Sequence, residues 1–156
     1  QVKDYASALE YYHRVEAIQP ENHNILFYMG SCYAEQGKYD DALQYFFKLD
    51  YLESNCIKAW RGIGWCSFVS GKYDQAMKYY DKILAVKPIP ADYLNAGHVA
   101  WRVGEIDKAI RLYSKVVEES GNKEVFLEMF NKDRNGLIKQ GIAAEDIPTN
   151  VGHDLT

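Results

Sequence analysis

The sequence predicts an all-α solenoid of stacked helical hairpins, because one spacing of glycine, alanine and aromatic residues recurs along most of the chain. Gly30 and Gly64 stand 34 residues apart, and Gly97 follows 33 residues later. Nearly the same interval separates two further sets: Gly37, Gly71 and Gly104, and Ala42, Ala76 and Ala109. Self-similarity at this period is typical of repeat arrays. Within each interval, apolar residues recur at i, i+3, i+4 and i+7, the pattern of an amphipathic helix.

Each unit is predicted to contain two helices joined by a glycine turn. In the first full unit these run from His23 to Glu35 and from Tyr39 to Leu52, with Gly37 at the turn. A glycine inside a helix costs about 1 kcal/mol relative to alanine. Gly30 and its equivalents therefore indicate two helices that cross too closely for a side chain, with the repeated alanines as the facing small surface.

Proline and glycine residues set the expected boundaries of the units. Pro20 and Pro88 are expected to stop second helices, because proline lacks the N–H group that helix propagation needs. Residues 1–21 fit only the second helix of a truncated repeat, so we expect the chain to be a C-terminal piece of a longer array. The expected divisions are 1–21, three hairpins within 22–121 (about 22–55, 56–89 and 90–121), and a cap with an irregular tail over 122–156.

These residues together resemble the signature of the tetratricopeptide repeat over about residues 3 to 121. The matching positions are Leu26, Met29, Gly30, Tyr33, Ala42 and Phe46; Trp60, Ile63, Gly64, Ala76, Tyr80 and Pro88; and Tyr93, Gly97, Ala109 and Tyr113. The resemblance implies a right-handed superhelix of helical hairpins, a concave surface lined by first helices, and a protein-binding rather than catalytic role.

A capping helix is predicted from about Lys123 to Gln140, ending at Gly141. The segment from Asn131 to Ile142 imitates a calcium-binding EF-hand loop, but its first and twelfth positions lack carboxylates, so we favour the helix. No spacing of His or Cys predicts a zinc site, and we expect no metal or other cofactor.

Composition excludes several classes of partner. The 156 residues include 18 Lys and Arg against 22 Asp and Glu, a net charge of −4 that predicts no nucleic-acid surface. No apolar run approaches the roughly 20 residues needed to cross a bilayer. Three cysteines without paired spacing weakly favour a reducing compartment such as the cytoplasm, although an upstream targeting segment would lie outside this chain.

Candidate binding residues come from the face of the first helices that lies about a third of a turn from the hairpin core. This face is expected to carry aromatic anchors and steering cations. The predicted groove residues are Phe27, Ser31, Glu35, Lys58, Arg61, Trp65, Phe68, Leu94, His98, Trp101 and Arg102. The alternative interpretation is that the aromatic members pack between adjacent first helices.

The leading functional hypothesis is a module that binds a segment of a partner protein in this groove. Some family members clamp a C-terminal carboxylate with Lys, Asn and Arg, but at the matching places only Arg61 and Asn95 fit. Two alternatives stay open: a client chaperone resembling those of type III secretion translocators, and an assembly subunit that self-associates. An enzyme is disfavoured, since no catalytic set can be assembled from the sequence.

Overall fold

The structure is a computed structural model in which residues 4–139 are described. Over this range the chain forms eight α-helices and no strand. They are α1 (Tyr5–Ile18), α2 (Asn24–Glu35), α3 (Tyr39–Leu52), α4 (Ile57–Val69), α5 (Tyr73–Leu84), α6 (Pro90–Arg102), α7 (Ile106–Ser120) and α8 (Lys123–Lys139). Within that part of the chain, none of the helices is long and apolar enough to span a bilayer.

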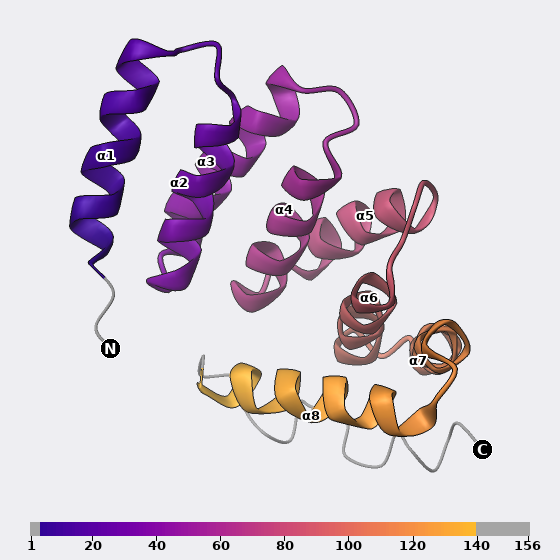
Figure 1. Cartoon of the computed structure of the whole chain (residues 1–156). Coiled ribbons are helices and arrows are strands. Elements are labelled where there is room, and N and C mark those ends of the chain that lie inside the picture. The colour runs from indigo at the N-terminus through magenta and orange to yellow at the C-terminus, as the bar shows by residue number, and fades with distance from the viewer. Residues whose placement is uncertain (1–3, 140–156) are drawn as a thin grey trace.

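The helices form three antiparallel hairpins that stack into a curved solenoid. Helix α2 pairs with α3, α4 with α5, and α6 with α7, while α1 packs on α2 at one end and α8 on α7 at the other (Figure 1). Contacts between α2 and α4, and between α4 and α6, place the first helices of the hairpins along one side of the curve. This arrangement is the predicted solenoid, with α1 as a helix that lacks its own hairpin partner.

The repeated helix glycines lie where an aromatic ring of the second helix crosses the first helix. A Cβ atom added to Gly64 would lie 2.9 Å from the Tyr80 ring, and one added to Gly97 would lie 2.5 Å from the Tyr113 ring. The prediction that no side chain fits there is confirmed, but the obstacle differs from the expected one. The ring, rather than the facing alanine, occupies the space beside each glycine.

The turn glycines adopt the left-handed backbone that their position requires. Gly37, Gly71 and Gly104 have φ of 78°, 80° and 87°. At the first turn the Gly37 N–H donates to the Ala34 carbonyl at 3.0 Å, and the Lys38 N–H donates to the Tyr33 carbonyl at 2.9 Å. The last carbonyl groups of a helix have no partner within the helix. These two bonds give the Ala34 and Tyr33 carbonyls a donor while the chain turns into α3.

The predicted helix ends agree closely with the observed ones. The first helix of the first full hairpin starts at Asn24 rather than His23, and its second helix has the predicted bounds. The segment that imitates an EF-hand is helical from Asn131 to Lys139, as predicted; its remainder, and the proposed stop at Gly141, lie outside the described residues. The predicted capping helix is therefore α8, which begins at the expected residue, Lys123.

We predict that Gly64→Leu destabilises the second hairpin, because the added side chain would overlap the Tyr80 ring. Overpacking of this kind costs about 1–3 kcal/mol or more, and thermal melting followed by circular dichroism would measure it. Gly136→Ala is the control: no atom lies within 4 Å of the added Cβ, and alanine is favoured over glycine in a helix by roughly 0.5–1 kcal/mol. An unchanged melting temperature for Gly64→Leu would contradict the crossing geometry.

Candidate functional site

Two adjoining cavities form a continuous groove along the inner side of the solenoid. The first, of about 330 Å³, lies between α2 and α4, and the second, of about 370 Å³, extends from these helices to α6. Both cavities touch the same four residues: Ser31, Phe46, Gly62 and Trp65. We call this pair of cavities the concave groove.

The aromatic floor of the concave groove depends on a pair of glycines. The Phe46 ring comes from α3 and lies between Gly30 of α2 and Gly62 of α4, since a Cβ on either glycine would approach it to 2.7 Å. Gly62 is not part of the repeated glycine set, and its place in the neighbouring hairpins is taken by Tyr28 and Asn95. This extra helix glycine lets the Phe46 ring reach the groove.

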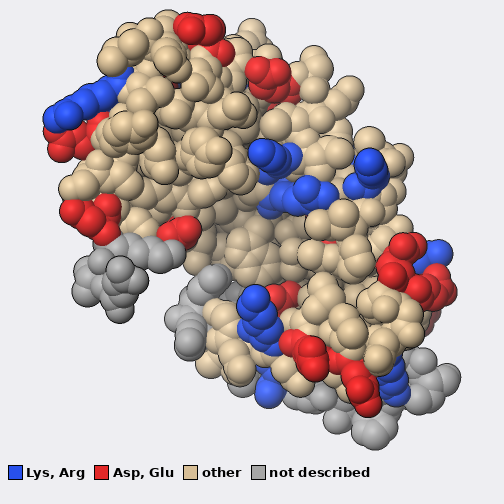
Figure 2. Space-filling view, in the orientation of Figure 1, with Lys and Arg blue, Asp and Glu red and all other residues tan. Residues whose placement is uncertain are grey.

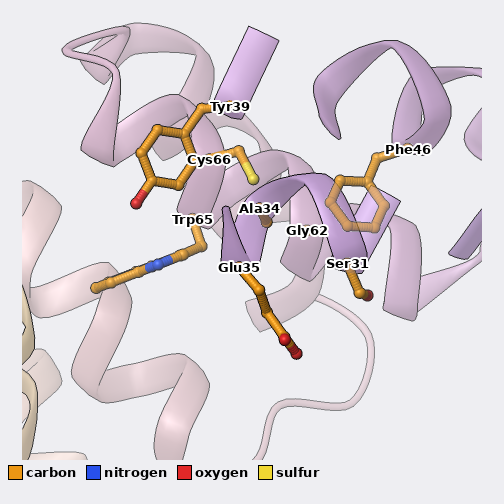
Figure 3. Close-up of a pocket in the computed structure, with 8 residues that line it drawn as sticks. All are labelled: Ser31, Ala34, Glu35, Tyr39, Phe46, Gly62, Trp65 and Cys66. Atoms are coloured by element: carbon orange, nitrogen blue, oxygen red, sulfur yellow. The ribbon is translucent and has the colours of Figure 1, made fainter. Parts of the chain in front are cut away.

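The first cavity combines apolar walls with a single carboxylate. In Figure 3, Trp65 and Tyr39 lie at one end and Phe46 and Ser31 at the other, while the Glu35 side chain points away from the ring cluster. The Trp65 ring is partly exposed and lies 5.7 Å from the Phe68 ring. A bulky side chain entering here would replace water on several aromatic faces, which is favourable.

The second cavity contains an ion pair that joins two repeats. Arg61 on α4 donates from Nε and Nη2 to the two carboxylate oxygens of Asp92 on α6, at 2.8 and 2.9 Å. Asp92 is 1% exposed and also accepts the N–H of Ile89, so it caps α6. These hydrogen bonds raise the pKa of the Arg61 guanidinium. Arg61 was predicted to steer a ligand, whereas its charge is neutralised by the buried Asp92 carboxylate.

Lys58 supplies the exposed positive charge at this end of the groove. Its ammonium lies 5.3 Å from the centre of the Phe27 ring, within the range of a cation–π contact. Both residues line the second cavity. Figure 2 shows Lys and Arg side chains gathered at the rim of the hollow, over the start of α4.

Three of the predicted groove residues are core residues instead. Phe68, Leu94 and His98 are at most 4% exposed. The Phe68 ring packs between the rings of Trp65 and Tyr73. Helices in the middle of the stack contact neighbours on several sides, so a face a third of a turn from the hairpin core is still largely buried. The prediction that these three side chains are exposed for ligand contact was therefore wrong.

His98 has structural partners on both ring nitrogens. Its Nδ1 lies 2.9 Å from the Tyr113 hydroxyl and its Nε2 lies 3.4 Å from an Asp133 carboxylate oxygen on α8. The Phe130 ring covers it at 5.3 Å. These contacts tie the capping helix to the last hairpin, which accounts for a histidine at this position.

Trp101 and Arg102 lie outside the two cavities. Trp101 is partly buried against the main core. The Arg102 guanidinium lies 4.9 Å from the centre of the Tyr73 ring. The predicted residues that the concave groove brings together are therefore Phe27, Ser31, Glu35, Lys58, Arg61 and Trp65.

The predicted groove set omits Phe46, Gly62, Tyr80 and Asn95, although all four line the groove; Asn95 was considered only as a residue that fits a carboxylate clamp. Phe46 and Tyr80 were assigned to the hairpin core, because their repeat positions are core positions. Gly62 carried a usable signal, since it is a helix glycine outside the repeated set.

The described residues hold no cluster of His, Cys, Asp and Glu that could bind a metal ion. All three cysteines are free. Burial raises the pKa of the Cys66 thiol to about 12, so it is not a reactive nucleophile at neutral pH. Its role is that of an apolar filler beside the groove.

A solenoid of helical hairpins with a concave groove defines a class of protein-interaction scaffolds, and comparison with known families agrees. Models of the tetratricopeptide repeat match residues 1–66, 57–90 and 93–123. The chain belongs to the tetratricopeptide repeat family, whose members serve as protein–protein interaction modules. No curated protein sequence matches the chain at a significant level.

Solved structures show the same fold at low sequence identity. Two crystal structures of MamA are each 22% identical to the chain, with a TM-score of 0.74. Both alignments cover 97% of this chain; they cover 85% of the MamA chain in the first structure and 81% in the second. A tetratricopeptide repeat protein from Parabacteroides merdae is 19% identical, with a TM-score of 0.57, over 97% of this chain and 63% of its own. These similarities concern the fold.

We predict that Arg61→Leu lowers the free energy of unfolding, because it leaves the buried Asp92 carboxylate without its cation. A buried polar group that loses its partner costs about 1–3 kcal/mol, and more when it is charged. Urea denaturation would measure the change, with Lys58→Leu as the control, since Lys58 is exposed and has no carboxylate partner within residues 4–139. Equal urea midpoints for Arg61→Leu and the unmodified chain would show that the ion pair does not hold α4 to α6.

Proposed function

We propose that the chain binds an extended segment of a partner protein in the concave groove. The observation that carries this proposal is the continuity of the two cavities across α2, α4 and α6, over a floor formed by Phe46 and Gly62. Because the two cavities, of about 330 and 370 Å³, adjoin one another, each can take a bulky side chain of one continuous segment. The family membership supports the same role.

Trp65 is the proposed main anchor, since it lines both cavities and its ring is partly exposed. Tryptophan is enriched among residues whose truncation strongly weakens binding, because a large rigid ring buries much apolar area at little entropic cost. Lys58 at the rim favours a partner with acidic residues at that end. Its contribution is expected to fall with rising salt, since surface charges are screened over about 8 Å at physiological ionic strength.

We predict that Trp65→Ala weakens binding of selected peptides by about 30-fold or more, equivalent to about 2 kcal/mol. The probes are random dodecapeptides displayed on phage in two formats, one internal and one with a free C-terminus. They are selected on the whole 156-residue chain and then measured by calorimetry. Tyr51→Ala is the matched control, because that aromatic residue is 89% exposed and lies outside the groove.

A second variant keeps this test decisive if Trp65→Ala alters folding. Ser31→Phe should place a ring in the strip shared by both cavities and block the groove without truncating the core. The proposal fails if neither library yields a binder, or if the selected peptides bind Ser31→Phe as tightly as the unmodified chain.

The two alternatives predict different results in the same selection. A client chaperone would enrich many apolar peptides without a common pattern, because it must accept diverse unfolded segments. A self-associating subunit would yield no groove-dependent peptide and would show a mass that rises with protein concentration in sedimentation. A defined peptide pattern with dependence on Trp65 supports the proposed function over both.

A further inference from the structure

One buried hydroxyl group in the groove wall has no hydrogen-bond partner of normal geometry among the described residues. Phe46, Tyr80 and Tyr113 occupy the same repeat position, each against a helix glycine. Phe46 has no hydroxyl, and the Tyr113 hydroxyl lies 2.9 Å from His98 Nδ1. The Tyr80 hydroxyl is fully buried and makes no hydrogen bond of normal geometry with the described residues. Only one other buried side-chain polar atom in that part of the chain shares this property, Arg134 Nε on α8.

The repeat register explains why Tyr80 differs from Tyr113. His98 supplies a ring nitrogen to Tyr113, but the corresponding residue one repeat earlier is Trp65. The indole N–H can donate and cannot accept, so it cannot receive the Tyr80 hydroxyl proton. A buried hydroxyl without a partner costs free energy of folding, and such groups in natural proteins require an explanation.

The surroundings of Tyr80 keep its hydroxyl protonated beneath the wall of the second cavity. Burial raises the pKa of Tyr80, and the nearby Asp92 carboxylate adds to the rise. The Asn95 side chain lies close enough to the hydroxyl to lower the pKa, as a weak donor to its oxygen, but the contact falls short of normal hydrogen-bond geometry and leaves the hydroxyl proton without an acceptor in the described part of the chain. Tyr80, Asn95, Arg61 and Asp92 all line the second cavity. The hydroxyl is therefore a hydrogen-bond donor at neutral pH.

The charge of this wall favours a neutral acceptor. Arg61 and Asp92 neutralise each other through two hydrogen bonds, so the pair adds no net charge. A carboxylate placed beside Tyr80 would be repelled by the nearby Asp92 carboxylate, while the exposed cation of this cavity, Lys58, lies over the Phe27 ring. A main-chain carbonyl oxygen accepts hydrogen bonds without that repulsion.

We propose that the Tyr80 hydroxyl, together with the Asn95 amide, binds a main-chain carbonyl oxygen of the partner segment, which is internal to the partner's chain rather than its C-terminal end. This inference rests on the proposed function and adds the chemistry of one contact. It also accounts for a hydroxyl at a position where phenylalanine, as at Phe46, packs equally well against glycine.

We predict that Tyr80→Phe weakens binding of the tightest selected peptide about fivefold or more, while its melting temperature stays the same or rises. The binding loss corresponds to about 1 kcal/mol, the usual net value of one hydrogen bond. The stability of the fold rises or stays the same, because the substitution removes a buried hydroxyl that has no acceptor within residues 4–139. Calorimetry with the synthetic peptide and thermal melting of the whole chain measure the two effects.

Tyr113→Phe is the matched control, since it removes an equivalent hydroxyl that has a partner. It should lower the melting temperature by a few degrees, as expected for about 1 kcal/mol in a domain of this size, and leave peptide binding unchanged. A smaller than fivefold binding loss for Tyr80→Phe, or a melting temperature lowered as in Tyr113→Phe, would overturn the inference.

A comparison of two forms of the same peptide, one with a free C-terminal carboxylate and one with a C-terminal amide, tests whether the groove binds the end of the ligand chain. The amide is expected to bind at least as tightly, and weaker binding of the amide would overturn the assignment of a main-chain carbonyl. A peptide that depends on Trp65 but not on Tyr80 would leave the proposed function intact and refute this contact alone.

Discussion

The architecture depends on an aromatic ring of each second helix lying against a glycine of its first helix. This contact sets how closely the two helices of a hairpin approach, and it recurs with Phe46, Tyr80 and Tyr113. Each ring is buried, so removing it would open a cavity at the centre of a hairpin. The turn glycines then only need to join two helices whose packing these rings have defined, and α5 ends at Leu84, before the predicted stop at Pro88.

The ring contact also determines where polar groups lie. A tyrosine at the ring position adds a hydroxyl group, and the residue that follows the glycine, His98 or Trp65, determines whether that hydroxyl has an acceptor. His98 bonds to Tyr113 and thereby helps attach α8, while the indole of Trp65 cannot accept the hydroxyl hydrogen of Tyr80. One repeated packing position thus serves a structural purpose in one hairpin and lines the groove in another.

Local and periodic features were predictable from the sequence, whereas contacts between repeats were not. Periodicity predicted the hairpins, the turns and the capping helix, because each depends on residues close in sequence. It misplaced Phe68, Leu94 and His98, because helical spacing describes one helix and not how many neighbours surround it. The Arg61 and Asp92 pair joins residues 31 positions apart, and no sequence pattern here links a particular arginine to a particular aspartate.

The Arg61 and Asp92 pair has a mechanical consequence. In a solenoid each hairpin touches only its neighbours, so the overall bend accumulates joint by joint. This pair spans the joint between α4 and α6 and forms part of the second cavity's wall. A change in the angle between α4 and α6 would therefore alter both the bend of the array and the width of the groove at that joint. A bound segment that fixes the groove width would also fix the bend.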